Sequence, residues 1–147
     1  MIEASRLVHR LNTRVDDFCY ALLKDEITYV SVGLIEGKSL YSAFTHRKWQ
    51  EVYVNFSLHH HDPSFNAAIN IPEMPIFWDM VPKNTKKAAV IMKERCEMVD
   101  ITSGITMGFK KEASLLLLTI GSKLHNSDFL VAFNESIIPQ LKIGDIL

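Results

Sequence analysis

The chain has 147 residues, of which 48% are hydrophobic and 22% charged, and its formal net charge is −1 with histidine neutral. This length suits one domain with a substantial core. Because the chain has no basic excess and no long basic run, its composition excludes the electrostatic footprint of a nucleic-acid-binding protein.

The cysteines and the apolar pattern indicate the compartment. Cys19 and Cys96 lie far apart and have neither disulfide-scaffold nor zinc-site spacing, which favours a reducing cytoplasm. The first residues, MIEASRLVHRL, lack the apolar run of a signal peptide, and no stretch approaches membrane-spanning length. We therefore expect a cytoplasmic protein with no membrane partner.

The first third of the chain predicts a helix followed by a β-hairpin. Apolar residues at helical spacing predict the helix over residues 5–23. β-branched and aromatic residues predict a strand over 27–34, and a turn at 36–38 leads into a return strand over 39–44.

Both tryptophans of the chain lie at the ends of the next segment, from Trp49 to Trp78. This segment also holds Tyr53 and the step Asp62-Pro63. A large aromatic buries apolar area while its polar group needs a partner, and a buried carboxylate needs hydrogen bonds. An apolar wall with a few polar groups is typical of a small-molecule pocket.

The same segment also allows a purely structural interpretation. WQEVY is one turn of an ordinary amphipathic helix, which Thr45 can cap and which would end near Leu58. Asp62-Pro63 can simply start another helix, with Asp at the N-cap and Pro at the first helical position. Periodicity alone favours this interpretation over a pocket.

Three adjacent histidines, His59 to His61, precede Asp62 and raise the question of a metal site. Side chains adjacent in sequence point in different directions and seldom hold one ion, so we favour a polar loop and assign no metal ligand. No nucleophile–base–orienter spacing is visible, and a lactonase acting through the histidines is the one enzymatic alternative. We assign no catalytic residue and predict that the chain is not an enzyme.

The second half predicts further helices and a second strand pair. The LLLL run at 115–118 does not alternate, which indicates a central strand buried on both faces. A helix is predicted from Pro63 until Pro72 and Pro75 end it, followed by an extended piece at 76–78 and strands over 102–109 and 113–122. Between them we predict a helix from the N-cap Asn84 to about Met98, whose inward residues are Ala88, Ala89, Met92 and Cys96. The last predicted helix covers 127–141, and Pro139 should distort or end it; its inward stripe is Phe129, Leu130, Phe133, Ile137 and Leu141.

Strand pairs separated by helices predict the class of the fold. We expect an α+β protein, an α-β-α sandwich with a central antiparallel sheet and helices on both faces.

Four motifs in order carry a family resemblance: W-x3-Y from Trp49, Asp62-Pro63, P-I-F-W ending at Trp78, and S-G-I-T-M with a strand that ends Leu-Thr. From about residue 27 to 122 the chain resembles the autoinducer-binding domain of LuxR-type regulators. Those domains bind N-acyl-homoserine lactones in bacterial quorum sensing. Their fold is an α-β-α sandwich with the ligand between the sheet and one helical layer, which agrees with the element order above.

The resemblance implies a ligand site and no cofactor. It implies that Trp49 donates its indole N–H to the lactone carbonyl and that Asp62 accepts the acyl-amide N–H. The other implied roles are Tyr53 lining the acyl-chain side, Trp78 packing against the lactone ring, Thr119 offering a hydroxyl to the amide or 3-oxo oxygen, and Gly104 allowing close packing near the ring. The family commonly has a Tyr four residues before this Trp, where the chain has the shorter Thr45.

LuxR-type regulators continue into a helix-turn-helix domain, whereas this chain stops at Leu147 without a recognition helix or basic tail. We therefore expect one ligand-binding domain over 1–147 with no DNA-binding domain, either an excised domain or a natural protein of this form. The expected partners are a small-molecule autoinducer and a second protein, in a homodimer or in a heterodimer that silences a full-length regulator. Thr45 also motivates an alternative ligand, a different small amphiphile.

Overall fold

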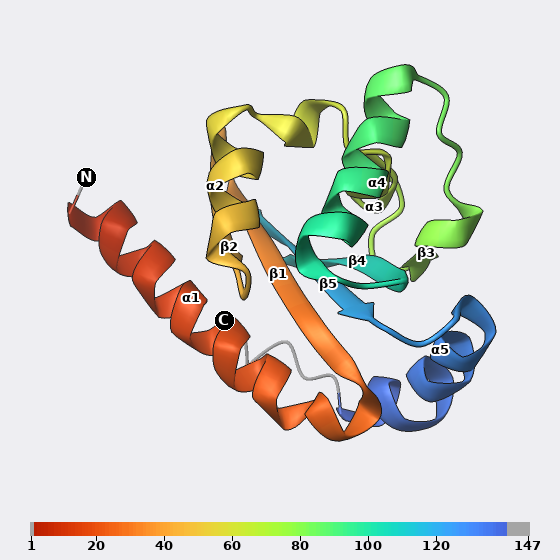
Figure 1. The fold of residues 1–147 in the computed structure, drawn as a ribbon. Helices are drawn as coiled ribbons and strands as arrows, with labels where there is room; N and C mark the ends of the chain where they lie inside the picture. The colour runs from red at the N-terminus through yellow and green to blue at the C-terminus, as the bar shows by residue number, and fades with distance from the viewer. Residues whose placement is uncertain (1, 141–147) are drawn as a thin grey trace.

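The computed structural model describes the backbone of residues 2–140 and the side chains of residues 5–139. Its centre is one antiparallel sheet of five strands in the order β2-β1-β5-β4-β3 (Figure 1). The strands are β1 Ile27–Glu36, β2 Ser39–Phe44, β3 Ile76–Phe77, β4 Ser103–Lys111 and β5 Ser114–Ser122. The LLLL run lies in β5, the middle strand, as the sequence predicts.

Helices cover both faces of this sheet, so the predicted α-β-α sandwich is confirmed (Figure 1). One layer consists of α1 Ile2–Ala21 and α5 Asn126–Ala132, which continues through a π-helical turn, Phe133–Ile137, and a 3-10 turn, Ile138–Gln140. The other layer consists of α2 Arg47–Asn55, α3 Pro63–Asn70 and α4 Lys86–Val99. No helix within residues 2–140 has the length and apolar character needed to cross a membrane.

The two faces of the sheet carry different side chains because strand residues alternate between them. Towards α1 and α5 the sheet presents large aliphatic residues, such as Val30, Leu116 and Ile120, which form one core cluster with these helices. Towards α2, α3 and α4 it presents small or polar residues at paired positions in the ladder: Ser31 opposite Thr119, Thr119 opposite Thr106, Gly33 opposite Ser42, and Gly104 opposite Gly121. The second face is therefore shallow and polar.

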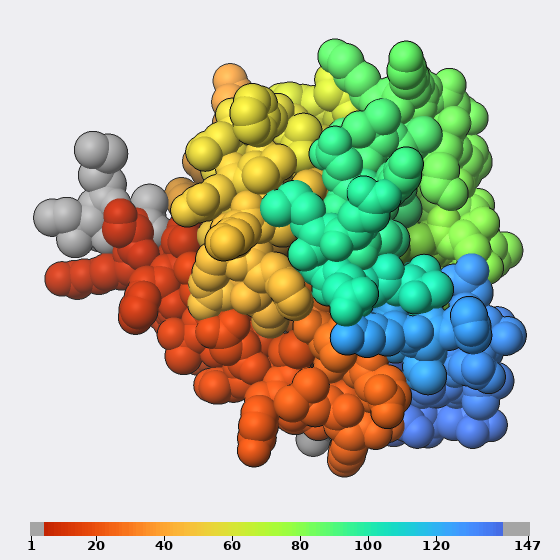
Figure 2. All heavy atoms as spheres, in the orientation of Figure 1, coloured from red at the N-terminus to blue at the C-terminus, as the bar shows by residue number. Residues whose placement is uncertain are grey.

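Two helices of the layer that covers this second face, α2 and α4, lie next to each other. Figure 2 shows atoms of α2 and α4 side by side across the front of the molecule, and these helices are in contact. Large aromatic side chains of this layer, including Trp49, Tyr53 and Trp78, form a second core cluster against the sheet.

Two predicted helix caps are wrong. The N-cap of α2 is His46, while the hydroxyl of Thr45 accepts a hydrogen bond of 3.1 Å from the Val30 N–H and joins the end of β2 to β1. The N-cap of α4 is Thr85, not Asn84, and its hydroxyl accepts from the Ala88 N–H at 3.0 Å. In both cases the observed cap lies one residue after the predicted one, because a neighbouring polar residue can also cap the helix.

The last helix keeps most of its predicted inward stripe. The buried members are Phe129, Phe133 and Ile137. Leu130 is exposed, against the prediction, and Leu141 lies outside the described residues. The helix widens into its π-helical turn before Pro139, so the distortion starts earlier than the proline.

Gly104 illustrates how closely the outer layer approaches the sheet. A Cβ atom added at Gly104 would lie 2.4 Å from Cε3 of the buried Trp78 ring, whereas one added at Gly33 would meet its nearest neighbour, Leu40 Cδ1, at 3.4 Å. We expect Gly104→Ala to lower the free energy of unfolding by about 1–3 kcal/mol, because the ring or the strand must shift. Urea denaturation would measure this, with Gly33→Ala as the matched control that leaves stability unchanged or slightly raised. Equal effects of the two substitutions would contradict this packing.

Candidate functional site

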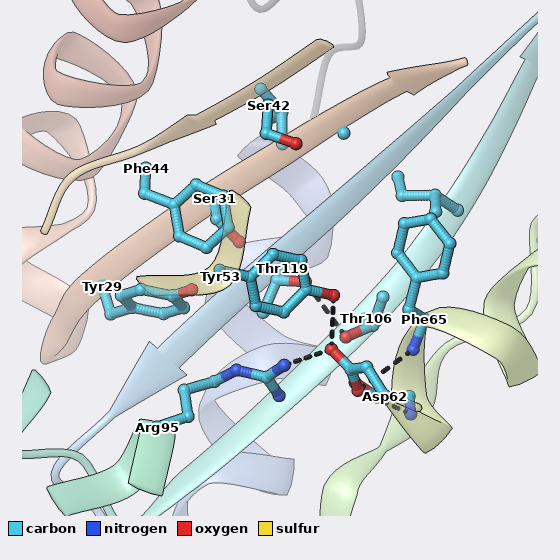
Figure 3. Close-up of a pocket in the computed structure, with 14 residues that line it drawn as sticks. Tyr29, Ser31, Ser42, Phe44, Tyr53, Asp62, Phe65, Arg95, Thr106 and Thr119 are labelled. Carbon is cyan, nitrogen blue, oxygen red and sulfur yellow. Dashed lines mark hydrogen bonds and ion pairs between the residues drawn. The ribbon is translucent and has the colours of Figure 1, made fainter. Parts of the chain in front are cut away.

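A small cavity lies between the sheet and the helices α2, α3 and α4 (Figure 3). Its volume is about 30 Å³, enough for about two water molecules. The sheet contributes Ser31, Thr106 and Thr119 among others, and the helical layer contributes Tyr53, Asp62, Ser64, Phe65 and Arg95. The chain thus brings side chains from the sheet and from all three helices of this layer to one partly polar space.

Asp62 holds the start of α3 and also faces this space. It is the N-cap residue, its Oδ1 accepts from the Ser64 N–H at 3.1 Å, and Pro63 follows at the first helical position. The predicted cap is therefore confirmed. At the same time the side chain is only 2% exposed and lines the cavity, so the structural and the pocket interpretations describe one arrangement.

Every acceptor position of the Asp62 carboxylate is already used. Oδ1 accepts from the Ser64 N–H, from the Ser64 hydroxyl at 2.7 Å and from the Phe65 N–H at 3.4 Å. Oδ2 accepts from the Tyr53 hydroxyl at 2.8 Å and forms an ion pair with Arg95. A carboxylate has about four lone-pair sites. An incoming N–H therefore finds no unused acceptor here unless one of these partners moves.

Arg95 of α4 is the residue that the sequence analysis missed. It is 3% exposed, and its guanidinium lies among aromatic rings: Cζ is 4.9 Å from the centroid of Trp78, 5.8 Å from Tyr53 and 5.9 Å from Trp49. These distances allow cation–π attraction. The charge of Asp62 and three ring faces together stabilise a cation that is excluded from water.

Burial and charge act in opposite directions on this ion pair. Burial raises the pKa of the Asp62 carboxyl, but the Arg95 charge and the hydrogen bonds from Ser64 and Tyr53 outweigh it, and the pKa lies below its ordinary value. Burial lowers the pKa of Arg95, but the Asp62 carboxylate outweighs burial and the pKa lies above its ordinary value. Both groups are therefore charged at neutral pH.

The spacing along α4 is the signal that points to Arg95. Ala88, Met92, Arg95 and Val99 follow at intervals of four, three and four residues and are all buried. The predicted inward set contained Ala88 and Met92 correctly, but Ala89 is exposed and Cys96 is only partly buried. A single arginine on an otherwise apolar helical stripe indicates a buried, paired charge.

Two buried donors near Arg95 have no partner of normal geometry among the described residues. They are the indole N–H of Trp49, which is 1% exposed, and the hydroxyl of the fully buried Tyr29. Burial raises the pKa of Tyr29 to about 12, so its hydroxyl keeps its proton. A buried donor without an acceptor costs about 1–3 kcal/mol. Both groups can therefore gain from an acceptor atom brought by a ligand.

Trp78 and Thr119 are joined through a third residue. The Trp78 indole N–H donates to the Thr106 hydroxyl at 3.1 Å, and the hydroxyls of Thr106 and Thr119 lie 3.1 Å apart. Of the residues implied by the resemblance, Tyr53, Asp62 and Thr119 line the cavity. Trp49 and Trp78 flank Arg95, Gly104 lies against Trp78, and Thr45 does not line the cavity.

The three histidines lie beside the site rather than in it. Leu58–His60 forms a 3-10 turn that His61 follows, and the rings of His59 and Phe65 are 5.5 Å apart. Within the part of the chain that the structure describes, no group of three or more His, Cys, Asp or Glu side chains is placed to hold a metal ion.

A sequence profile of the autoinducer-binding domain matches residues 4–136, nearly the whole chain. The chain belongs to the autoinducer-binding domain family. Members of this family bind small-molecule signals and are not enzymes. None of the curated protein sequences compared with the chain matches it.

Solved structures with the same fold include three LuxR-type proteins. The N-acylhomoserine-lactone-dependent factor CepR2 of Burkholderia cenocepacia has a TM-score of 0.60 at 14% identity, covering 95% of this chain and 98% of CepR2. The ligand-binding domain of VqsR from Pseudomonas aeruginosa gives 0.63 at 12% identity, covering 90% and 86%. SdiA of Escherichia coli gives 0.58 at 14% identity, covering 92% and 69%. At these identities the likeness establishes the fold of this autoinducer-binding domain.

The ion pair makes a direct prediction for stability. We expect Arg95→Met to lower the free energy of unfolding by about 3–5 kcal/mol, because Asp62 would remain buried without its counter-charge. The double variant Arg95→Met/Asp62→Asn should lose less than the single variant, since Asn also caps a helix and no lone charge is buried. Lys93→Met, on the exposed side of the same helix, is the matched control in urea denaturation. A loss below about 1 kcal/mol in Arg95→Met would show that the pair is not needed.

Proposed function

We propose that this autoinducer-binding domain senses a small acyl-chain signal, whose polar head lies in the cavity at Asp62 and Arg95. The observation that carries this proposal is the pair of buried donors, on Trp49 and Tyr29, beside a cavity lined by polar side chains. Convergent polar groups beside aromatic and apolar side chains, here Phe44, Phe65 and Leu117, are typical of a small-molecule site.

N-acyl-homoserine lactones are the first ligand class to consider, because CepR2 is described as dependent on such a lactone. A second class has the same tail without the lactone, since one structure of SdiA is a complex with octanoyl-rac-glycerol. Under either class, we propose that Trp49 donates to a head-group carbonyl and that Tyr53 and Thr119 line the ligand. Trp78 and Gly104 then define the wall at the ring end.

An acyl tail needs more room than the cavity offers, and a neighbouring cleft provides it. This cleft has a volume of about 270 Å³ and lies at the edge of the sheet between α1, β2 and α2. Val8, Leu40, Tyr41 and Val54 give it apolar walls, and it shares Ser42 and Tyr53 with the cavity. We propose that the tail passes Ser42 and Tyr53 into this cleft, with about 0.8 kcal/mol gained for each buried CH₂.

Binding must enlarge the path between cavity and cleft. A cavity of about 30 Å³ does not hold a head group, so the side chains of Phe44 or Phe65, which do not contact the Asp62 carboxylate, have to move outward. Any ligand that does so binds the opened form better than the closed one and shifts the population towards it. Pairing with a second copy or with a full-length regulator stays a separate prediction.

Ligand-induced stabilisation tests the proposed function. At a free concentration of 100 times its dissociation constant, a ligand should add about 2.7 kcal/mol of stability, or about 5–10 °C in Tm for a domain of this size. The panel is hexanoyl to dodecanoyl homoserine lactones together with octanoyl glycerol, measured by thermal shift. If no member of the panel moves Tm, the proposed function is wrong.

The tail path has its own test. Val54 is 50% exposed at the cleft, so Val54→Trp should fill the cleft and weaken the longest acyl ligands by roughly tenfold or more, while short ones are unaffected. Val90→Trp, which places the same ring on an exposed position of α4 away from this cleft, is the control. Isothermal titration of the chain-length series measures both. Uniform weakening at all lengths would place the tail elsewhere.

A further inference from the structure

We propose that the head-group end of this site selects ligands that present oxygen acceptors and no amide N–H, that is an ester, ketone or carboxylate in place of an N-acyl amide. This inference rests on the proposed function and narrows its ligand class. The residues that carry it are Asp62, Arg95, Trp49 and Tyr29.

The first step is the state of Asp62. Its two oxygens together receive five hydrogen-bond or ion-pair contacts, from Ser64, Phe65, Tyr53 and Arg95. Three of these come from groups that also fix the start of α3, and the other two come from buried side chains of α2 and α4. An amide N–H could reach the carboxylate only by displacing one of them and leaving that group buried without its partner.

The second step is a surplus of donors in the same volume. A guanidinium has five N–H donors. Among the described residues, Arg95 has two acceptors: Asp62 Oδ2 and, weakly, Met92 Sδ at 3.5 Å. The Trp49 indole N–H and the Tyr29 hydroxyl lie in the same buried interior, and neither has a hydrogen-bond partner of normal geometry among these residues. The only carboxylate that lines the cavity is therefore fully used, whereas two buried donors beside it still lack a partner.

The third step is what other side chains of the cavity can do. The hydroxyls of Thr106 and Thr119 are engaged with each other and with Trp78. The hydroxyls of Ser31 and Ser42 can donate or accept, so they do not discriminate between head groups. Asp62 and Arg95 are therefore the residues that distinguish an oxygen acceptor from an amide N–H in the head group. Because a charged donor forms the stronger hydrogen bond, a ligand oxygen facing Arg95 gains more than an N–H can.

The decisive experiment compares two ligands that differ at one position. N-octanoyl-homoserine lactone has an amide N–H, and the corresponding octanoyl ester of the hydroxylactone has an oxygen there. With the unmodified protein, we expect the ester to bind more tightly, on the order of tenfold, in isothermal titration. Equal affinities, or tighter binding of the amide, would overturn the proposal. This comparison needs no variant and so does not depend on whether a variant folds.

Two further ligands identify the kind of acceptor. Octanoate and methyl octanoate share the tail and differ in charge, so the tighter of them shows whether the acceptor is a carboxylate or a neutral oxygen. If neither these two ligands nor the ester lactone binds while the amide lactone does, the inference is wrong and the proposed function stands. If none of the four ligands binds, both are wrong.

A variant isolates the role of Arg95. Arg95→Met frees Asp62 Oδ2, so the preference should reverse, and the amide should then bind more tightly than the ester. Lys93→Met, on the exposed face of α4, should keep the ester preference. An unchanged ester preference in a folded Arg95→Met protein would remove Arg95 from the explanation and overturn the proposal.

Discussion

The ion pair between Arg95 and Asp62 is the contact on which the arrangement of the outer layer depends. Asp62 begins α3, Arg95 comes from the middle of α4, and Tyr53 of α2 donates to the same carboxylate oxygen. One carboxylate therefore connects all three helices over this face of the sheet. Burying two charges is costly, and the cost is offset only where geometry and hydrogen bonds are complete. The surrounding donors complete the hydrogen bonding of Asp62, and three aromatic rings surround the guanidinium of Arg95.

The sheet makes this arrangement possible by having small side chains on one face. Gly104 lies against the rigid ring of Trp78 and requires glycine for this close packing, whereas a Cβ at Gly121 would lie 2.6 Å from the flexible end of the Ile101 side chain. Thr106 and Thr119 supply the polar atoms between them. On the opposite face, aliphatic residues pack against α1 and α5 and form the larger core cluster. One face therefore provides most of the stability, and the other can hold a partly polar cavity.

Most of the fold follows from local sequence patterns, whereas the key contact of the site does not. The strands, most of the inward stripe of the last helix and the Asp62-Pro63 helix start are short-range signals, and the structure agrees with them except at Leu130. Arg95 was missed because a charged residue is expected on the exposed side of a helix unless its partner is known. That partner is 33 residues away in the sequence. The size of the cavity also depends on how side chains from distant parts of the chain pack together, and no local sequence pattern specifies that packing.

Family membership and ligand chemistry rest on different residues in this domain. The profile match and the similar solved structures reflect the pattern of strands, helices and aromatic side chains, and at 12–14% identity they establish the fold. The ligand, under the proposal made above, is selected by the few polar groups of the interior, where one buried arginine pairs with the only carboxylate of the cavity. An oxygen acceptor can enter beside the ion pair and leave it intact, whereas an amide N–H must break a contact of Asp62 that also holds the three helices together. We therefore propose that the ion pair of Asp62 and Arg95 both stabilises the helical layer and selects the head group of the ligand.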